Sequence, residues 1–152
     1  MHTAALPRML DTVMPRLTRL FLKAGLLYLV AAAALGGLML MQSPLALPAW
    51  IVLLRPVYLH LFMVGWITQL IFGVVFWMFP KLTRERPRGS ERLGWVVFVT
   101  LNAGLLLRAV AEPLATLRPD AGAGWVLVLA AVLQLIACLG FVANTWGRVK
   151  ER

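Results

Sequence analysis

The stretch RPVYLHLFMVGWITQLIFGVVFWMFP, residues 55–80, joins a long apolar run to a single histidine, His60. About 20 apolar residues in a row can cross the hydrocarbon core of a bilayer as one helix. A polar ring in lipid is costly unless a partner holds it, so an intramembrane histidine indicates a functional site. The stretch therefore predicts a transmembrane helix that carries one candidate ligand.

The composition of the whole chain places it in the membrane class. Apolar residues make up 61 % of its 152 residues, against roughly 45–50 % in a soluble domain. We predict an all-α, integral membrane four-helix bundle that forms a single transmembrane domain, 1–152. A cytoplasmic segment, 1–19, would precede helices at about 20–41, 51–79, 93–112 and 124–146. The lone cysteine, Cys138, excludes an internal disulfide and is expected in the core.

The basic residues predict the orientation of these helices. Four Lys or Arg lie at the N-terminal end, five lie in the middle connection, 81–92, and three lie at the C-terminal end. Only Arg55, Arg108 and Arg118 fall on the opposite side. The positive-inside rule then places both termini in the cytoplasm of a multi-pass protein of the bacterial inner membrane. The net charge of +9 is a topology signal that also attracts anionic membrane lipid, and we expect no nucleic acid partner.

Tryptophans support the ends of the predicted helices. Trp side chains favour the two membrane–water interfaces. Five of the six lie near the ends of the apolar runs: Trp50, Trp77, Trp95, Trp125 and Trp146.

Polar residues are rare within the runs, and several fall at one depth. Arg55 and Tyr58 lie just outside His60, and Arg108 is expected at a similar depth on the third helix. Glu112 follows Arg108 by four residues, so these two form either part of a site or an ion pair within one helix. Residues nearer the middle are better suited to hydrogen bonds between helices than to a proton path: Gln69, Asn102 and Gln134.

Helical periodicity divides the second run into two faces. At about 100° per residue, His60 shares a face with an apolar wall formed by Val64, Ile67, Ile71, Val74 and Met78. Gln69 is expected about 180° away, between Gly65 and Gly73, on a face suited to close helix packing. One face should therefore pack against a helix while the other presents the histidine.

A histidine above an apolar wall suits haem, because the iron needs a neutral imidazole and the macrocycle needs an apolar slot. Arg55 and Arg108 could pair with its propionates, with Tyr58, Val64 and Ile67 lining the slot. A bare metal ion would want more ligands than this depth offers. The competing interpretation is a structural hydrogen bond from His60 and a snorkelling Arg55.

The second run resembles a haem-ligating helix of the haem-copper oxidase superfamily, which includes the nitric oxide reductases. The resemblance covers about thirty residues and depends on His60, Gly73, Trp77 and Pro80, the last three within GVVFWMFP. It implies that His60 is an axial ligand to a b-type haem. The family's large subunit has twelve helices in three four-helix arcs, and this chain has the length of one arc. By that analogy we expect a homo-oligomer, specifically a homotrimer.

This chain departs from the family in having no second intramembrane histidine, so one copy cannot form the binuclear centre or a bis-histidine haem. With one protein ligand, the iron would keep a position open for a diatomic gas (NO, CO or O2), unless Met63 or Met78 closed it. We therefore expect a cytochrome b-like haem protein for gas binding or electron transfer, with turnover undetermined.

Two alternatives are open. The first is a haem-free accessory or assembly subunit of a respiratory oxidase. The second is a small transporter or proton-conducting module that uses His60, Gln69 and Glu112. The transporter ranks last, because Gln69 is expected to face away from His60 and no broken helix is expected.

Overall fold

The computed structural model describes residues 14–83, 86–118 and 122–149, and they form four long helical rods. The first rod is α2, Arg16–Met41; the third is α5, Glu91–Leu117; the fourth is α6, Ala123–Thr145, followed by the short 3₁₀ turn η4, Trp146–Arg148. All four rods are long and apolar enough to cross a membrane. The predicted all-α, four-helix composition is thereby confirmed.

The second rod is continuous from residue 49 to residue 78, but its hydrogen bonding changes along its length. A 3₁₀ segment, η1 (Ala49–Leu54), leads into the α-helical α3 (Arg55–His60). A π-helical segment, η2 (Leu61–Thr68), follows, and α4 (Gln69–Met78) completes the rod. A uniform α-helix was expected here, so the wide turns directly after His60 are a correction.

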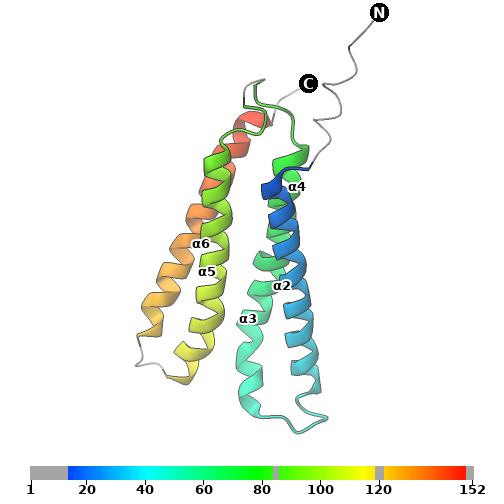
Figure 1. The fold of residues 1–152 in the computed structure, drawn as a ribbon. Coiled ribbons are helices and arrows are strands. Elements are labelled where there is room, and N and C mark those ends of the chain that lie inside the picture. Colours follow the sequence, from blue (N-terminus) through cyan, green and yellow to red (C-terminus); the bar gives the residue numbers. More distant parts are fainter. Residues whose placement is uncertain (1–13, 84–85, 119–121, 150–152) are drawn as a thin grey trace, which may run out of the picture.

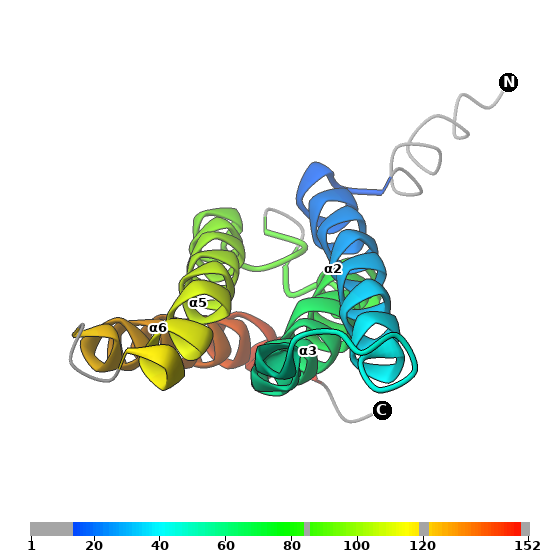
Figure 2. The same cartoon turned by 90° about the horizontal axis from the view of Figure 1, so that it is seen from below.

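The rods form an open arrangement of two hairpins. The start of α2, the end of α4, the start of α5 and the end of α6 lie at one end of the molecule (Figure 1). Helix α2 packs along the second rod and α6 packs along α5, and the hairpins meet where α5 faces α3 and η2 (Figure 2). Among the described residues α2 and α6 do not contact each other. Helix α5 is therefore the central element.

Two helix ends differ from the prediction. Helix α2 begins at Arg16, directly after Pro15, so residues 16–19 belong to the first rod and not to the preceding segment. Residues 1–13 lie outside the described residues. Helix α5 continues to Leu117 with Pro113 inside it, beyond the expected end near residue 112. At its start, the hydroxyl of Ser90 accepts a hydrogen bond from the backbone of Leu93, a standard N-cap.

Two apolar clusters form the core, one toward each end of the rods. The first contains Leu17, Phe21, Phe72, Phe76, Val97, Leu101 and Ala137. The second contains Ala32, Val57, Leu61 and Leu105. The ring of Phe72 stacks on that of Phe141 with 3.8 Å between centroids, which ties α4 to α6.

Glycines bring α2 close to the second rod, as the sequence predicted. A Cβ at Gly65 would lie 2.8 Å from Cβ of Tyr28, and one at Gly73 would lie 2.9 Å from Cβ of Phe21. On the other side of the contact, a Cβ at Gly25 would lie 3.4 Å from the carbonyl oxygen of Trp66. Close approach of this kind supplies packing energy where lipid provides no hydrophobic drive between helices.

Helix α6 uses a stripe of small residues that the sequence analysis missed. Every seventh residue of the helix is buried: Ala123, Ala130, Ala137 and Asn144. On the facing helix, a Cβ at Gly104 would lie 2.8 Å from the carbonyl oxygen of Ala130. A seven-residue repeat keeps one side of a helix against its neighbour, so α6 and α5 pack along their lengths.

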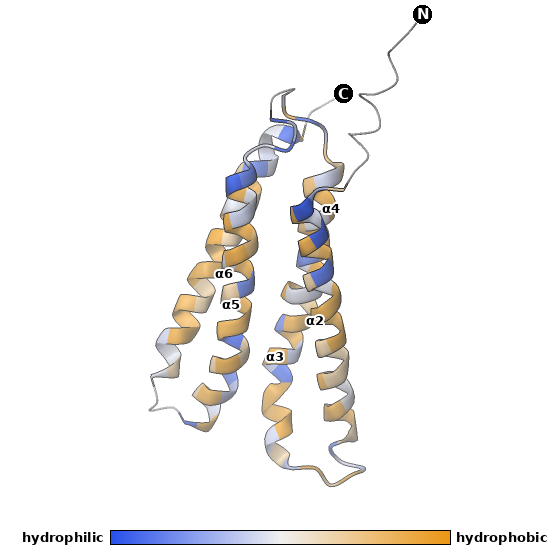
Figure 3. Cartoon of the chain, viewed as in Figure 1, coloured by the Kyte–Doolittle hydropathy of each residue, from blue (hydrophilic) through white to orange (hydrophobic). Residues whose placement is uncertain are grey.

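The outer surfaces of the rods are apolar, as a lipid environment requires (Figure 3). Helix α6 exposes large side chains such as Val128, Leu135 and Leu139. Cys138 is exposed among them, so its predicted place in the core is wrong. The reason is its position next to Ala137, which turns it away from α5.

The close contact of α2 with α4 leads to a stability prediction. Gly73→Ala should lower the free energy of unfolding by about 1–3 kcal/mol, because its methyl group would overlap the Cβ of Phe21. Gly37→Ala is the control, since nothing lies within 4 Å of its Cβ position, and it should gain up to about 1 kcal/mol of helix propensity. Thermal unfolding in detergent measures both. Equal shifts in the same direction would contradict the packing argument.

Candidate functional site

His60 ends α3 and directs its ring toward α5. Its Nδ1 lies 2.8 Å from the backbone carbonyl oxygen of Pro56, one turn earlier in the same helix. A carbonyl oxygen can only accept a hydrogen bond, so Nδ1 carries the hydrogen and donates it. In the neutral ring Nε2 then holds the free lone pair. The imidazole is thus fixed in one tautomer with its second nitrogen available as a ligand.

Glu112 of α5 completes the surroundings of the ring. Its Oε1 lies 3.3 Å from Nδ1 of His60 and accepts a hydrogen bond from Nε of Arg108 at 2.7 Å. The side chain of His60 is 28 % exposed and that of Glu112 is 10 % exposed. Arg108 also donates from Nη1 to Oε1 of Gln134 at 3.4 Å. These four residues are called the His60 cluster, and they join α3, α5 and α6.

The pairing of Arg108 with Glu112 confirms that the two form an ion pair within one helix. Alignment of their charges at a spacing of four is expected from helix geometry. The spacing could not predict the contact between Glu112 and His60, because that contact depends on how α3 faces α5. Two polar atoms of the cluster, Oε2 of Glu112 and Nε2 of Gln134, are buried without a hydrogen-bond partner among the described residues.

A second polar group lies deeper in the rods. Asn102 of α5 accepts hydrogen bonds at Oδ1 from Nε2 of Gln69, at 2.8 Å, and from the hydroxyl of Tyr28, at 2.9 Å. Its Nδ2 donates to the backbone carbonyl of Phe98 at 2.8 Å. Gln69 is fully buried. The prediction that Gln69 and Asn102 form hydrogen bonds between helices is confirmed, and Tyr28 adds α2 to the group.

The expectation that Gln69 faces away from His60 is wrong, since both side chains reach α5. The π-helical segment between them is the physical reason. Each of its turns takes up about one residue more than an α-turn, which rotates every later side chain by about 100°. Just under two such turns separate His60 from Gln69, so the accumulated rotation cancels most of the half-turn expected for an α-helix.

The same rotation divides the predicted apolar wall. Val64 packs against both core clusters, and Ile67 is partly buried. Ile71, Val74 and Met78 are exposed on the outer surface. The five residues therefore do not form one continuous wall below His60. Met63, considered as a further iron ligand, is also exposed.

Arg55 and Tyr58 face α2 and not the His60 cluster. They line a cavity of about 370 Å³ with Gly36, Met39, Leu40 and Val52. The ring of Tyr58 lies against Gly36 and stacks on Phe62. Arg55 precedes His60 by five residues, which is about 140° around an α-helix. The spacing alone could therefore have shown that Arg55 and His60 lie on different sides of the helix, and that Arg55 does not share a site with Arg108.

None of the principal cavities formed by the described residues is lined by His60. An apolar cavity of about 530 Å³ lies between α5 and α6 and is lined by Leu106, Val110, Leu114 and Val126, among others. It contains no titratable side chain. Nor does any group of three His, Cys, Asp or Glu within the described segments lie close enough to hold a metal ion.

No family model, no curated protein and no solved structure matches this chain.

The His60 cluster predicts a large stability effect for its carboxylate. Glu112→Ala should lower the free energy of unfolding by about 3 kcal/mol, because it leaves the partly buried Arg108 without a counter-ion. The double variant Arg108→Leu/Glu112→Leu should recover most of this loss, since it removes both charges together. Reversible unfolding in detergent, followed by circular dichroism, measures the free energy of unfolding of both variants.

Glu91→Ala is the matched control, because Glu91 is exposed in the first turn of the same helix. Its loss should cost about 0.3–1 kcal/mol through the helix dipole. A Glu112→Ala variant no less stable than Glu91→Ala would show that the ion pair contributes nothing.

Proposed function

We propose that this protein binds a b-type haem in the membrane through Nε2 of His60. The observation that supports this is the hydrogen bond from Nδ1 to the Pro56 carbonyl, with Glu112 beside it. Histidines that ligate metals commonly donate their other ring N–H to a carbonyl or carboxylate, which fixes the tautomer and raises ligand basicity. The resemblance of residues 55–80 to a haem-ligating oxidase helix supports the same assignment.

The donor chemistry of the His60 cluster fits haem. However, one copy of the chain forms little of the apolar slot that the macrocycle needs. His60 is partly exposed and lines none of the principal cavities. The macrocycle would therefore lie against the outer surface of the chain, covered by lipid or by a second copy. This requirement supports the proposed homo-oligomer, a homotrimer by analogy, because a neighbouring copy would complete the slot.

The other residues take separate roles in this proposal. Arg108 is engaged by Glu112 and Gln134, so in this proposal it positions the carboxylate, and its contact with a propionate stays a prediction. Glu112 in turn holds negative charge beside Nδ1. When bound, the haem would supply a one-electron redox couple and an exchangeable position for a small gas. Gas binding or electron transfer is thus the proposed activity, at the bacterial inner membrane.

The proton-conducting alternative gains one observation and loses another. The π-helical segment brings Gln69 and His60 to the same neighbour, α5. However, Asn102 and Glu112 are ten residues apart, which is about 15 Å along the helix. The buried side chain of Leu105 lies in that interval. The two polar groups therefore act as separate contacts, and this alternative is not preferred.

Absorption spectra of the purified protein test the haem proposal. Wild type from haem-replete cells should show a Soret band that shifts on reduction and again with CO. His60→Gly should lose at least about 90 % of the band and regain it with added imidazole, because the free base replaces the missing ligand. Gln69→Leu is the control for loss of a buried polar group and should keep its haem. A colourless wild type would instead favour the haem-free accessory subunit.

Glu112→Gln offers a finer test of the same site. The amide keeps the size of the side chain but removes the negative charge beside Nδ1, so the imidazole becomes a weaker donor. The haem reduction potential should rise by an amount on the order of tens of millivolts. A spectroelectrochemical titration measures it, with Glu91→Gln as the control that should not change. An unchanged or lowered potential in Glu112→Gln would mean that Glu112 does not tune the ligand.

A further inference from the structure

Arg148 is a fully buried cation at the end of the rods opposite His60. It lies in the η4 turn after α6 and has 0 % of its surface exposed. Its Nη2 donates to the carbonyl oxygen of Phe79 at 2.7 Å, and its Nε donates to that of Pro80 at 3.1 Å. These carbonyls follow the last turn of α4, where backbone acceptors lack helical partners and a cation is favoured.

Capping α4 does not account for the whole guanidinium. Its Nη1 is buried without a hydrogen-bond partner among the described residues. A buried donor left unsatisfied is costly, and the cost is larger on a charged group. No carboxylate within the described segments forms an ion pair with Arg148. Within the described residues nothing accepts a hydrogen bond from this donor, so it is available to an added acceptor.

A cavity of about 360 Å³ lies over this group, within the size range of small-molecule sites. Buried Arg148, half-buried Arg88 and exposed Lys81 all line it. The guanidinium groups of Arg148 and Arg88 at one cavity repel each other unless an anion lies between them. The remaining wall is largely apolar and includes Trp77, Met78 and Phe79.

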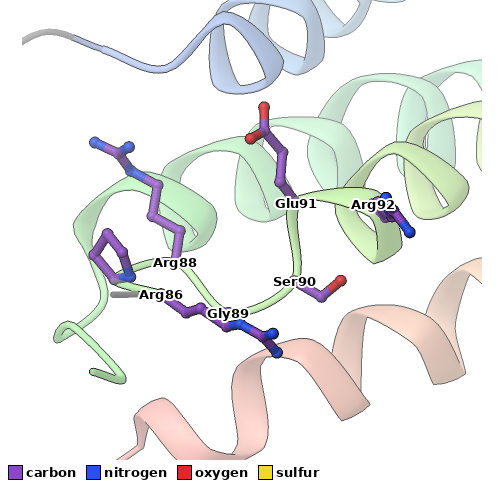
Figure 4. Close-up of a pocket in the computed structure, with 7 residues that line it drawn as sticks. Arg86, Arg88, Gly89, Ser90, Glu91 and Arg92 are labelled. Carbon is purple, nitrogen blue, oxygen red and sulfur yellow. The ribbon is translucent and has the colours of Figure 1, made fainter. Parts of the chain in front are cut away.

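The neighbouring cavity, lined by residues 86–92, is larger, but its charged side chains do not point toward one another. Figure 4 shows Arg86 and Arg88 directed to opposite sides of the loop, with Glu91 directed toward α2. Only the smaller cavity combines Arg88 with a buried, unsatisfied guanidinium. It is therefore the better candidate for an anion site.

We propose that this cavity binds the phosphate group of an anionic phospholipid, with Arg148 and Arg88 as its principal contacts. Guanidinium groups form strong, charge-assisted hydrogen bonds with phosphate oxygens. The cavity lies where the spans Ala49–Met78 and Ala123–Arg148 end, at the level expected for lipid headgroups. The exposed side chain of Met78 and the ring of Trp77 offer an apolar surface for the acyl chains. Free inorganic phosphate shares the headgroup chemistry but would not use that surface.

Lipid titrations of the whole chain in non-ionic detergent test the site, with native mass spectrometry as the readout. Phosphatidylglycerol should bind at one molecule per chain, at least about tenfold more tightly than phosphatidylcholine. Arg88→Gln should weaken phosphatidylglycerol binding about tenfold, as expected for the loss of one charge-assisted contact. Arg92→Gln is the matched control, because it removes the same charge four residues further on, in the first turn of α5, but does not line the cavity. It should bind as the wild type does.

Arg148→Gln should also lose selectivity, but it removes the cap of α4, so Arg88→Gln is the deciding variant. Equal binding of the two lipids, or equal losses in Arg88→Gln and Arg92→Gln, would overturn the proposal. Sodium phosphate is titrated separately at matched ionic strength. If it displaced phosphatidylglycerol from the wild type at comparable concentration, free phosphate would be the ligand and the lipid assignment would be wrong.

Discussion

A polar side chain in the membrane needs a partner within the protein, and helix α5 provides that partner at two depths. Asn102 holds Gln69 and Tyr28, and Glu112 holds Arg108 and lies beside His60. Water cannot replace these contacts in hydrocarbon, so they select one register of α5 against the second rod. The apolar clusters and the glycine contacts then pack the helices together in that register.

The π-helical segment makes this arrangement possible. A uniform α-helix from Arg55 to Met78 would direct His60 and Gln69 to opposite sides, and one of them would lose its contact with α5. The wider turns of Leu61–Thr68 bring both to the same neighbour while Gly65 still lies against Tyr28. Such segments occur frequently at functional sites, and here the segment begins at the residue after the candidate ligand.

The two proposed sites lie at opposite ends of the rods and draw on different parts of the chain. At one end the imidazole of His60 is held by a backbone carbonyl and lies beside a carboxylate. At the other, a buried guanidinium caps α4 and keeps one donor unused. The first suits a metal in a macrocycle and the second suits an anion. A phosphate at the second site would stabilise the α4–α6 contact without touching His60, so each site can be tested without the other.

Much of the fold follows from the sequence alone. Four apolar runs of membrane length, separated by short basic or proline-rich segments, determine four helices that are long and apolar enough to be membrane spans. The spacing of Arg108 and Glu112 determines their ion pair, and the spacing of Gly65 and Gly73 determines a close packing face. Both are local relations between residues of one rod, and the ion pair follows directly from the 3.6-residue period of an α-helix.

Only the tertiary structure decided which faces meet. Periodicity assumes one kind of helix, so it could not anticipate the π-helical turns that rotate Gln69 toward α5. It could not bring Glu112 to His60 or Arg148 to the carbonyls of Phe79 and Pro80, since these contacts join segments 52, 69 and 68 residues apart. Hydropathy also could not tell a core position from a lipid-facing one, as Cys138 shows, because both environments favour apolar side chains. The four apolar helices are therefore determined by the sequence, whereas both candidate sites depend on the way those helices pack.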